Sequence, residues 1–596
     1  MEDLFSKIIR PNSSFGAQQC QHGRDCELQD PDIYRGYIPL MLALYKSAFV
    51  LLLCDLWTCD GFGRHAPSWS RRIIVPSCCR QHASSSLPLR ARAGEQMETV
   101  DFVTQEEGTK NVQLPVVQLK GPHYFESLLP LLTSAVRGKS HRYMVELMGK
   151  WGDNFIVRFP FPWSRWIFLN EPQAIQALLI DINPEKSDDF KRGMSVLGKD
   201  GLFTAENTTW LQERRRIAPT MTERYVGDLH LIFEEEGAHL WARLEKAARS
   251  GESIEMDNAF VGTLFDITAR ITIGRSLGLR ADASSNPMTA DFGTALDEAM
   301  RRIVLPPGGG VLTALTPDGR RYRQAFRRID QLLDDCVQQR LQELGGGTTK
   351  TTDLLGVLLD AYAEGVLSLQ QVKDQLLTFL VAGHDTTAHT LSWMAWEIVQ
   401  KPGLQDALAA ETRLALPSRV DVTSKTSLSK LSLLDRVWQE SLRKHPVAAT
   451  GTLRQLKSMA MVPTSIGVDG LDRGSFTTSA HIQLPAHSKI SIPPFSIHRN
   501  HKHWPNPEIF EPSRFETAAV SERHPYAFQA FSAGPRNCIG KALARAEALS
   551  LMSVLLRRFE LSLADAKDRE SEPDDYHMIT RKPANGIRFY VKHRPD

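Results

Sequence analysis

A single cysteine, Cys538, lies between a glycine-rich loop and a stretch that predicts a long helix. The surrounding sequence is FSAGPRNCIGKALARAEALS, residues 531–550, in which Gly534 and Pro535 predict a tight turn. An amphipathic helical pattern begins just after the cysteine. A thiol at that place faces free backbone N–H groups and the positive end of the helix dipole, which favours the thiolate. Because a thiolate is both a nucleophile and a soft metal ligand, both functions have to be weighed.

Three interpretations of this cysteine compete. A lone cysteine is most often a small buried hydrophobic residue without a chemical role. A cysteine nucleophile needs a histidine base. The chain has 18 histidines, so their number does not show whether one of them serves as that base, although no known nucleophile signature surrounds Cys538. One thiolate cannot build a zinc site, but it suffices as the axial ligand of a haem, whose porphyrin supplies the other donors. Phe531 would then cover the haem face on the cysteine side, and Arg536 would reach a haem carboxylate.

The segment around Cys538 resembles the haem-binding signature of the cytochrome P450 family. FSAGPRNCIG, residues 531–540, matches Phe-x-x-Gly-x-Arg-x-Cys-x-Gly at every specified position. The resemblance implies that Cys538 ligates the iron of haem b and that Phe531, Arg536 and Gly540 lie against the haem. Gly540 lets the backbone pass close to a flat or bulky group because it has no side chain.

A second feature is a group of polar residues inside an apolar helix. Residues 368–400 predict a helix of roughly 48 Å, with Ser368 and Gln371 as a capping box. Its middle reads AGHDTT, residues 382–387. Apolar residues occupy too much of the helix circumference for this segment to face solvent. Since buried polar groups cost free energy unless they are hydrogen-bonded, the segment indicates a functional site.

AGHDTT is similar to the P450 motif Ala/Gly-Gly-x-Asp/Glu-Thr-Thr/Ser, which lies over the opposite face of the haem. The resemblance implies that Gly383 and the Thr386 hydroxyl loosen the helix ladder and make room for dioxygen. It also implies that Asp385 and Thr386 form an acid–alcohol pair that delivers protons for O–O cleavage without flooding the site with water. His384 is expected to be a hydrogen-bonded helix neighbour and not an iron ligand.

The segment WQESLRKHP places Glu440 and Arg443 three residues apart on one helix face. By itself this spacing is typical of an ordinary surface ion pair. The P450 family carries Glu-x-x-Arg here, followed by a segment like FEPSRFE, residues 510–516. The resemblance therefore implies a buried ion-pair network of Glu440, Arg443 and Arg514 behind the cysteine loop.

Three further residues are expected to bind the haem carboxylates. TTWLQERRR, residues 208–216, places Trp210 and Arg214 at i and i+4, which alone is typical of a solvated basic face. The resemblance to the P450 Trp-x-x-x-Arg makes both residues haem-carboxylate donors, since indole N–H and guanidinium donate without competing acceptors. Arg454 is a further candidate partner of a haem carboxylate.

These residues predict a mostly α protein with a cytochrome P450-like fold, a large helical domain with a small β-rich region. The predicted enzyme is a haem-thiolate monooxygenase that inserts one oxygen atom of O2 into a hydrophobic small molecule. No segment for binding a flavin or a nicotinamide is left once the motifs are placed, so electrons are expected from a separate partner. The resemblance to the P450 family implies that this partner is an NADPH-dependent reductase. That partner is expected to dock near Arg536, Lys541 and Arg545.

Two other functions are open at this stage. A haem-thiolate isomerase or dehydratase would rearrange a peroxide or an oxime without external electrons. The intact Asp385–Thr386 pair argues against it, because such an enzyme has no use for a relay of two protons. A non-catalytic haem-binding sensor is the other alternative, and the apolar helix and the complete set of motifs argue against it.

The substrate pocket is expected around Phe379 and Ala382 on the long helix and Val447 and Ala448 after the Glu/Arg helix. Parts of 190–204 and 280–315 are expected to complete it. These residues are largely apolar or small, which favours a hydrophobic substrate such as a terpenoid, a polyketide or a fatty acyl compound of secondary metabolism.

The first hundred residues have a different character. Residues 37–57 are about long enough to span a bilayer, although Lys46 and Asp55 interrupt them, and residues 61–94 contain six arginines and no acidic residue. The positive-inside rule then leaves the rest of the chain in the cytosol, as in a protein of the endoplasmic reticulum membrane. A poorly ordered leader, or a true start at Met97, is the alternative. The expected organisation is a leader over 1–96, a linker over 97–119 and one catalytic domain over 120–596.

Composition excludes other classes of protein. The chain has 23% charged residues and a formal net charge of +2, which gives no reason to expect a nucleic-acid partner. Beyond residue 80 the only cysteines are Cys336 and Cys538, so no disulfide framework is expected in the large C-terminal part.

Two strands are expected in 155–170 and one at NGIRFYVKH. Helices are expected at 208–222, 227–248, 257–276, 321–344, 353–363, 368–400, 403–415, 427–444 and 540–557.

Overall fold

A computed structural model describes most of the chain after residue 100. The chain divides into two compact units, 1–75 and 76–596, and every described residue belongs to the second. The predicted leader and its span over 37–57 lie outside the described residues. None of the described helices is long and apolar enough to cross a membrane. The described residues are 101–104, 113–122, 126, 130–131, 133–135, 137–158, 165–278, 287–304, 316–345, 353–416, 425–466 and 478–595.

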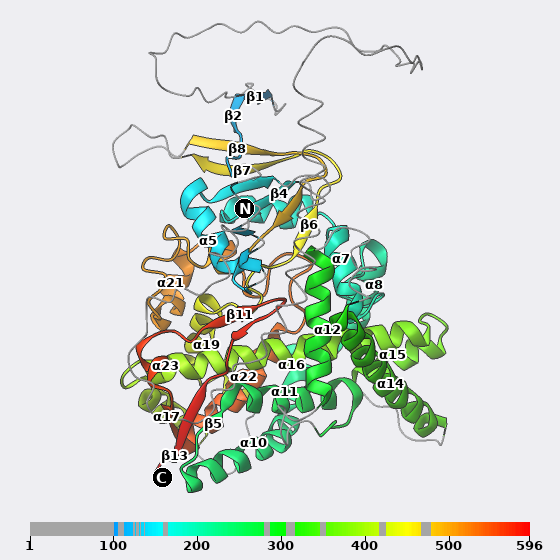
Figure 1. Cartoon of the computed structure of the whole chain (residues 1–596), viewed down its shortest axis with the longest axis vertical. Coiled ribbons are helices and arrows are strands. Elements are labelled where there is room, and N and C mark those ends of the chain that lie inside the picture. Colours follow the sequence, from blue (N-terminus) through cyan, green and yellow to red (C-terminus); the bar gives the residue numbers. More distant parts are fainter. Residues whose placement is uncertain are drawn as a thin grey trace, which may run out of the picture. The chain divides into compact units, whose positions relative to one another are not determined.

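The predicted fold class is confirmed, because helices make up most of the described chain and the strands form small sheets. Each predicted range contains a helix, but the one predicted over 427–444 is divided into α18 and α19, and the one predicted over 208–222 ends as an α-helix at Ile217 and continues as a 3-10 turn. Figure 1 shows most of the longer ones gathered in one part of the unit, whereas α5 lies beside the strands. The longer helices are α5 (Ser140–Trp151), α8 (Asn207–Ile217), α10 (His230–Ser250), α11 (Met256–Ile273), α12 (Pro287–Val304), α14 (Pro317–Gly345), α15 (Leu354–Ala363), α16 (Leu369–Gln400), α17 (Leu404–Ala415), α19 (Ser432–Lys444) and α22 (Lys541–Arg558). The shorter ones are α6 (Pro172–Gln176), α7 (Asp188–Met194), α9 (Glu223–Gly227), α18 (Lys425–Leu428), α20 (Pro494–Ile497), α21 (Thr517–Glu522) and α23 (Ala566–Glu570).

Helix α16 is the central element of the helical part. The predicted capping box is present, because the Ser368 hydroxyl accepts from the Gln371 N–H and the Gln371 side chain accepts from the Ser368 N–H. Most of its residues are buried, and it packs along α11, with α19 and α22 also against it. In Figure 1, α16 passes behind α12. Helix α16 is therefore enclosed by protein over most of its length.

The strands form four small sheets in the described part of the chain. β1 (Asp101–Thr104), β2 (Gln113–Val117), β8 (Thr478–Leu484) and β7 (Ala460–Ile466) form one sheet in that order, and β3 (Asn154–Arg158), β4 (Arg165–Leu169), β9 (Lys489–Ser491) and β6 (Leu453–Gln455) form another. β10 (Phe559–Leu563), β13 (Arg588–His593) and β5 (Ile254–Glu255) form a third, and β11 (Asp575–His577) pairs with β12 (Arg581–Pro583). The two strands predicted in 155–170 are β3 and β4, and the predicted final strand is β13.

The range expected to be a linker, 97–119, contains two of these strands. β1 pairs with β2, and β2 pairs in parallel with β8, where Val116 lies opposite His481 and Val117 opposite Ile482. Val116 is buried. This part of the expected linker therefore belongs to the folded domain, because its backbone hydrogen bonds and apolar side chains are used there.

Helix α12 was not predicted, although its sequence carries a helical pattern. Phe292, Ala295, Leu296 and Ala299 are buried and recur at the spacing of one helix face. α12 packs against α7 and α14. The apolar spacing of α12 is visible in the sequence, although residues 280–315 are expected above only to line the substrate pocket.

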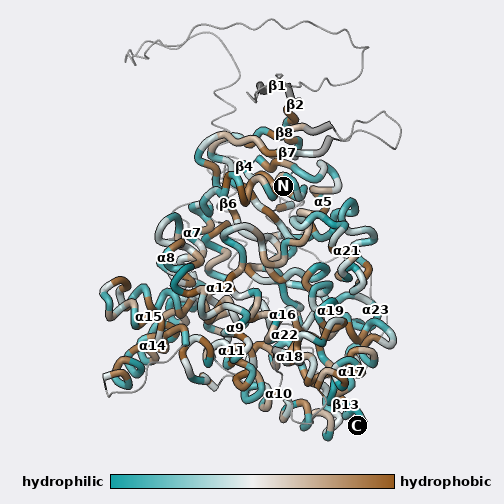
Figure 2. The backbone as a smooth tube through the Cα atoms, turned by 180° about the vertical axis from the view of Figure 1, so that it is seen from behind, coloured by the Kyte–Doolittle hydropathy of each residue, from teal (hydrophilic) through white to brown (hydrophobic). Residues whose placement is uncertain are grey.

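The hydrophobic core divides between the helices and the sheets. A large cluster joins α10, α11, α14, α16, α19 and α22, and a smaller one joins β4, β7, β8 and β9 with α6. Figure 2 shows apolar and polar segments alternating along surface helices such as α10 and α14, as expected of helices with one buried face. The two clusters fix the helices and the sheets from which the candidate site residues project.

Candidate functional site

The loop before α22, residues 531–540, is called the Cys538 loop below. Its turn requires glycine at Gly534, where φ is 74° and a Cβ would lie 2.9 Å from the Leu179 carbonyl oxygen. The turn closes with Asn537 N–H donating to the Gly534 carbonyl (3.1 Å) and Cys538 N–H donating to the Phe531 carbonyl (2.9 Å). These backbone bonds fix the cysteine at the start of α22.

The thiol of Cys538 is free and has accessible surface. Protein atoms nevertheless surround it, and this burial raises the pKa of the thiol, although the Gly540 N–H, Arg214 and Lys541 act in the opposite direction. The thiolate expected from the helix terminus is therefore not favoured by the protein alone. Gly540 caps α22 with an ordinary φ of −86°, and a Cβ there would lie 3.9 Å from the sulfur. Gly540 therefore leaves the space beside the thiol free of a side chain.

Phe531 lies half-buried at the start of the loop. Its ring centroid is 5.7 Å from that of Trp438 on α19, and the Lys541 ammonium is 5.9 Å from the Phe531 ring. The loop is thus attached to α19 by an aromatic contact as well as to α22 by the chain.

Arg214 and Trp210, both on α8, meet the Cys538 loop. Arg214 donates to the carbonyl and to the side-chain oxygen of Asn537, at 2.8 and 2.6 Å. The Arg536 guanidinium lies over the Trp210 ring at 4.3 Å and forms an ion pair with Glu206. The structure therefore brings these three predicted donors together, although a carboxylate of the protein already pairs with Arg536.

Arg454, on β6, is buried beside this cluster. One of its nitrogens donates to the Pro184 carbonyl at 3.2 Å, and its Nε has no hydrogen-bond partner among the described residues. Burial lowers the pKa of Arg454 to about 10, and the nearby charge of Arg536 acts in the same direction. A buried arginine with an unsatisfied N–H is costly, so this place favours an anionic group.

Lys186 is a further cation that the sequence interpretation missed. It is buried, its ammonium donates to the Phe203 carbonyl, and burial lowers its pKa to about 7 despite the charge of Glu206. Its backbone N–H donates to Glu206 at 2.9 Å, and it pairs with Arg454 in an isolated β-bridge. No local pattern in the sequence announces it, because the cluster forms from segments far apart in the chain.

The predicted network of Glu440, Arg443 and Arg514 is present. Arg443 donates to both oxygens of Glu440, at 2.8 and 2.7 Å, and both side chains are fully buried. Arg514 lies 3.5 Å from Glu440, and Arg443 also donates to the carbonyl oxygen of Pro507 at 2.6 Å. A backbone connection leads from here toward the loop, because Arg443 also donates to the carbonyl of His498, whose ring accepts from the Gln529 N–H at 2.8 Å.

Residues 382–389, called the α16 centre below, have partial exposure in the middle of a buried helix. Ala382 is exposed, and Gly383, Asp385 and Thr386 are half-buried, whereas most of α16 on either side is buried. The Thr386 hydroxyl donates to the Ala382 carbonyl at 2.9 Å. A Cβ at Gly383 would lie 2.6 Å from Thr268 on α11, so glycine is required there by helix packing. The α16 centre therefore has accessible surface inside the molecule.

Asp385 is not hydrogen-bonded to Thr386 in this structure. One oxygen of Asp385 lies 3.1 Å from Nε2 of His389, and the other accepts from the Thr580 hydroxyl at 2.5 Å. Burial disfavours the Asp385 carboxylate, but the charge of His389 outweighs burial and lowers its pKa. His384 bonds the Leu380 carbonyl through Nδ1 at 2.6 Å, as expected of a helix neighbour. The sequence interpretation missed His389 and Thr580, of which only His389, at i+4, had a local signal.

Glu547, on α22, is the second carboxyl group near the α16 centre. It is buried, it accepts from the Thr387 hydroxyl at 3.2 Å, and its Oε1 has no partner among the described residues. Burial raises the pKa of Glu547 to about 8, although the Thr387 bond acts in the opposite direction. This carboxyl group is therefore mostly protonated at neutral pH.

The residues predicted to line the substrate pocket differ in exposure. Ala382 and Ala448 are exposed, and Phe379 and Val447 are buried. Of the range 280–315, only 287–304, helix α12, is described.

The cations predicted to meet a reductase differ in exposure and pairing, since Lys541 is exposed, whereas Arg545 bonds Asp435 at 2.7 Å. Arg536 forms an ion pair with Glu206. Of these three cations, Lys541 is therefore the one that is exposed without an ion pair to a described carboxylate.

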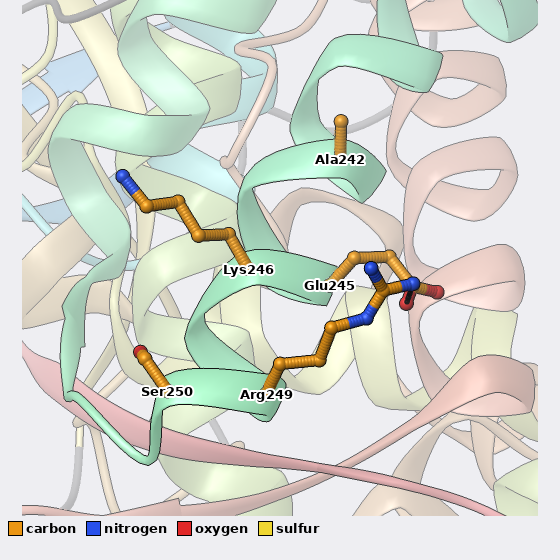
Figure 3. Close-up of a pocket in the computed structure, with 5 residues that line it drawn as sticks. All are labelled: Ala242, Glu245, Lys246, Arg249 and Ser250. Carbon is orange, nitrogen blue, oxygen red and sulfur yellow. Dashed lines mark hydrogen bonds and ion pairs between the residues drawn. The ribbon is translucent and has the colours of Figure 1, made fainter.

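A surface depression of about 600 Å³ on α10 lies apart from these residues. Figure 3 shows Ala242, Glu245, Lys246, Arg249 and Ser250, which line it, on successive turns of that one helix. Glu245 and Arg249 bond each other at 3.4 Å. The depression contains none of the motif residues and is a shallow groove between surface side chains of α10.

The residues around the Cys538 loop fit a haem. The sulfur is free and accessible, as an axial ligand must be, and Ala382 supplies exposed surface on α16. The unsatisfied Arg454 Nε, with Trp210 and Arg214 nearby on α8, suits an anionic carboxylate. In the described part of the chain, no cluster of three or more His, Cys, Asp or Glu could hold a metal by itself.

Comparison with known proteins gives a family and relatives of similar length. The family model "Cytochrome P450" matches residues 119–588. The human protein "Cytochrome P450 4B1" is 28% identical over 457 residues, which are 74% of this chain and 84% of that protein. Human "Cytochrome P450 4F8" is 25% identical over 77% of this chain and 87% of its own length. "Cytochrome P450 4c3" of Drosophila melanogaster is 25% identical over 72% of this chain and 80% of its own length.

Proposed function

We propose roles for these residues on the basis that the chain belongs to the cytochrome P450 family, whose members are haem-thiolate monooxygenases. The protein is accordingly a haem-dependent monooxygenase that uses O2, a hydrophobic small molecule and electrons from NADPH through a separate reductase. When bound, haem b supplies the activation of O2, and a thiolate ligand favours O–O cleavage. The roles below concern what this chain's own residues do.

Cys538 is the axial ligand. The observation that carries this proposal is the free, accessible thiol held at the start of α22 by the Gly534 turn and by the bond from its N–H to the Phe531 carbonyl. Phe531 and the gap left by Gly540 shape the surface around the sulfur. The protein alone raises the pKa of this thiol, and a bound haem iron would supply the positive charge that favours its thiolate.

Trp210, Arg214, Arg454 and Arg536 bind the haem carboxylates, and we add Lys186 to this set. All five lie within one cluster between α8, β6 and the Cys538 loop. Among the described residues, three arginines and Lys186 gather here with the carboxylates of Glu206 and Glu185, and the unsatisfied Nε of the buried Arg454 leaves a place for an added anion. Glu440, Arg443 and Arg514 hold the backbone behind the loop.

Asp385 and Thr386 handle protons at the α16 centre. The Thr386 hydroxyl is partly exposed and can turn from the Ala382 carbonyl to donate into the accessible space. Asp385 lies next to it in the chain and is ionised, so it offers a hydrogen-bond acceptor that can orient the groups through which a proton passes. The surrounding apolar residues of α16 limit the entry of water.

The substrate lies against Ala382 and Ala448, with Phe379 and Val447 behind them. These side chains offer no charge and no hydrogen bond, which fits a hydrophobic molecule.

For the N-terminal part we propose an anchor at 37–57 in the endoplasmic reticulum membrane, with the domain from residue 120 in the cytosol. Flotation of the full chain with vesicles tests the anchor, since a chain that stays in the soluble fraction contradicts it.

The test of the haem-thiolate role is the visible spectrum of the reduced, carbon-monoxide-bound protein. Wild type is expected to give the strongly red-shifted Soret band, and Cys538→Ser is expected to lose it. Cys336→Ser is the matched control, because Cys336 is buried on α14 and is expected to leave the band unchanged. A red-shifted band in Cys538→Ser would overturn the ligand assignment. Turnover without NADPH would favour the isomerase or dehydratase instead.

A further inference from the structure

Three side chains form a row beside the α16 centre. Nδ1 of His389 lies 2.9 Å from Asp257 on α11, and its Nε2 lies 3.1 Å from Asp385, one turn earlier on α16. His389 is 2% exposed and Asp257 is 7% exposed. Both ring nitrogens thus face carboxylate oxygens, so an imidazole in this row donates at both ends only when it is protonated.

The row has few other partners, and they do not neutralise it. The Ser392 hydroxyl donates to Asp257 at 2.6 Å, and the Thr580 hydroxyl donates to Asp385 at 2.5 Å. Both are neutral donors that favour ionised carboxylates. The other titratable groups that act on the row are His384 on α16, Lys582 on β12, Asp297 on α12 and Glu255 on β5.

The charges follow from this geometry. Burial disfavours an imidazolium, but the charges of Asp257 and Asp385 outweigh burial and raise the pKa of His389 to about 10. Burial likewise disfavours the two carboxylates, and the charge of His389 lowers the pKa of each. Without the imidazolium, two carboxylates would share a buried space and one of them would take up a proton.

We propose that His389 is a positioning residue for Asp385: as an imidazolium shared by two carboxylates, it keeps Asp385 ionised and in one orientation beside Thr386. The role rests on the proposed part of Asp385 in moving protons. His389 does not touch substrate or haem in this account, and it acts through Asp385. His389 and Asp385 lie one turn apart on α16, so this helix fixes the distance between the imidazolium and the carboxylate.

The test compares melting temperatures of the full-length, haem-loaded protein from pH 5 to pH 10. Because the pKa of His389 is raised from 6.5 to about 10, the stability that it contributes is complete below about pH 6.5 and is lost as the pH rises toward 10. His389→Gln is therefore expected to melt several degrees below wild type at pH 6, and the gap is expected to close toward pH 10. A gap that does not change with pH would mean a packing role and would overturn the proposal.

His384→Gln is the matched control, the same substitution on the same helix. Burial lowers the pKa of His384, so wild type loses stability relative to this variant as the pH falls below 6.5. The two variants are thus expected to diverge from wild type with opposite dependence on pH. If His389→Gln does not fold, Asp257→Asn replaces it. Removal of one carboxylate is expected to move the alkaline loss of stability to lower pH, and an unmoved loss contradicts the shared imidazolium.

A second readout addresses Asp385. In His389→Gln, product formed per NADPH consumed is expected to fall several-fold at neutral pH and to recover as the pH rises and Asp385 ionises. An unchanged ratio at every pH would overturn the positioning role. The melting curves need neither reductase nor substrate, so a failure of the proposed monooxygenase roles leaves them valid.

Discussion

Glu440 and Arg443, behind the Cys538 loop, bond each other through both oxygens, and Arg443 uses its remaining N–H groups on backbone carbonyls. The carboxyl groups around the α16 centre differ. Asp385 is ionised and tied to a charged histidine, whereas Glu547 is buried with no cation and keeps its proton. Both regions bury charge, and in the second region burial raises the pKa of one carboxyl group, Glu547, while the charge of His389 lowers the pKa of another, Asp385.

This difference matches the two proposed roles, support of the Cys538 loop for the first region and handling of protons for the second. The fully bonded Glu440–Arg443 pair holds backbone in place, because Arg443 also donates to the carbonyl oxygens of His498 and Pro507. Two carboxyl groups whose environments push their pKa values apart are typical of proton-transfer sites. The predictions below test whether the two regions behave in these two ways.

The largest expected effect is on the support of the Cys538 loop. Arg443→Leu removes both hydrogen bonds that Arg443 donates to the buried Glu440 and leaves it with Arg514 at 3.5 Å, and we expect the free energy of unfolding to fall by about 3–5 kcal/mol. Denaturant unfolding of the full chain measures it. The control is Lys401→Ala, which removes a surface pair of 3.6 Å with Glu511 and should cost less than about 1 kcal/mol. Equal losses in the two variants would contradict the supporting role.

The next effect is on the second carboxyl group of the α16 centre. Because burial raises the pKa of Glu547 from 4.5 to about 8, wild type loses stability as the pH rises from about 4.5 through 8. Glu547→Gln removes this loss, so it is expected to be more stable than wild type by on the order of a few kcal/mol at pH 8 and equal near pH 4.5. Thermal unfolding across this pH range measures it. The exposed Glu560→Gln on β10 should show no such divergence.

A third prediction concerns the hydroxyl group at the α16 centre. Thr386→Ala removes the partly exposed hydroxyl, and we expect NADPH to be consumed while product formed per NADPH falls about tenfold or more. Measurement of hydrogen peroxide beside product checks it. Thr390→Ala, one turn further along α16, removes a buried hydroxyl bonded to the Thr386 carbonyl and should leave that ratio near wild type. Full coupling in Thr386→Ala would remove Thr386 from the mechanism.

The smallest expected effect is at the surface of the Cys538 loop. Lys541 is exposed at the start of α22, so Lys541→Glu is expected to raise the KM for the reductase several-fold and to weaken its dependence on salt. Reductase titration at two ionic strengths measures it. Lys246→Glu, on the α10 surface of Figure 3, reverses an equal charge elsewhere and should change neither value. The same KM in both variants would place the reductase on another face.

Local patterns in the sequence predicted most of the helices and the residues of the Cys538 loop. The loop is continuous in sequence, so its turn residues, its cysteine and the start of α22 can be seen together. The Glu440–Arg443 pair is likewise local, at i and i+3, although its burial was implied only by the family resemblance. Helix α12 and the strands in 97–119 were missed, although α12 has a clear apolar face.

The sequence by itself predicted Cys538 as the ligand and determined the central helix and the family, because each is encoded in one continuous segment. Only the tertiary structure decided the charge of the acids around Thr386. Asp257 lies on α11 and Thr580 after β11, and Glu547 lies on α22, each far from residue 385 in the chain. Burial and the nearest charge fix a pKa, and both depend on which segments the fold brings together.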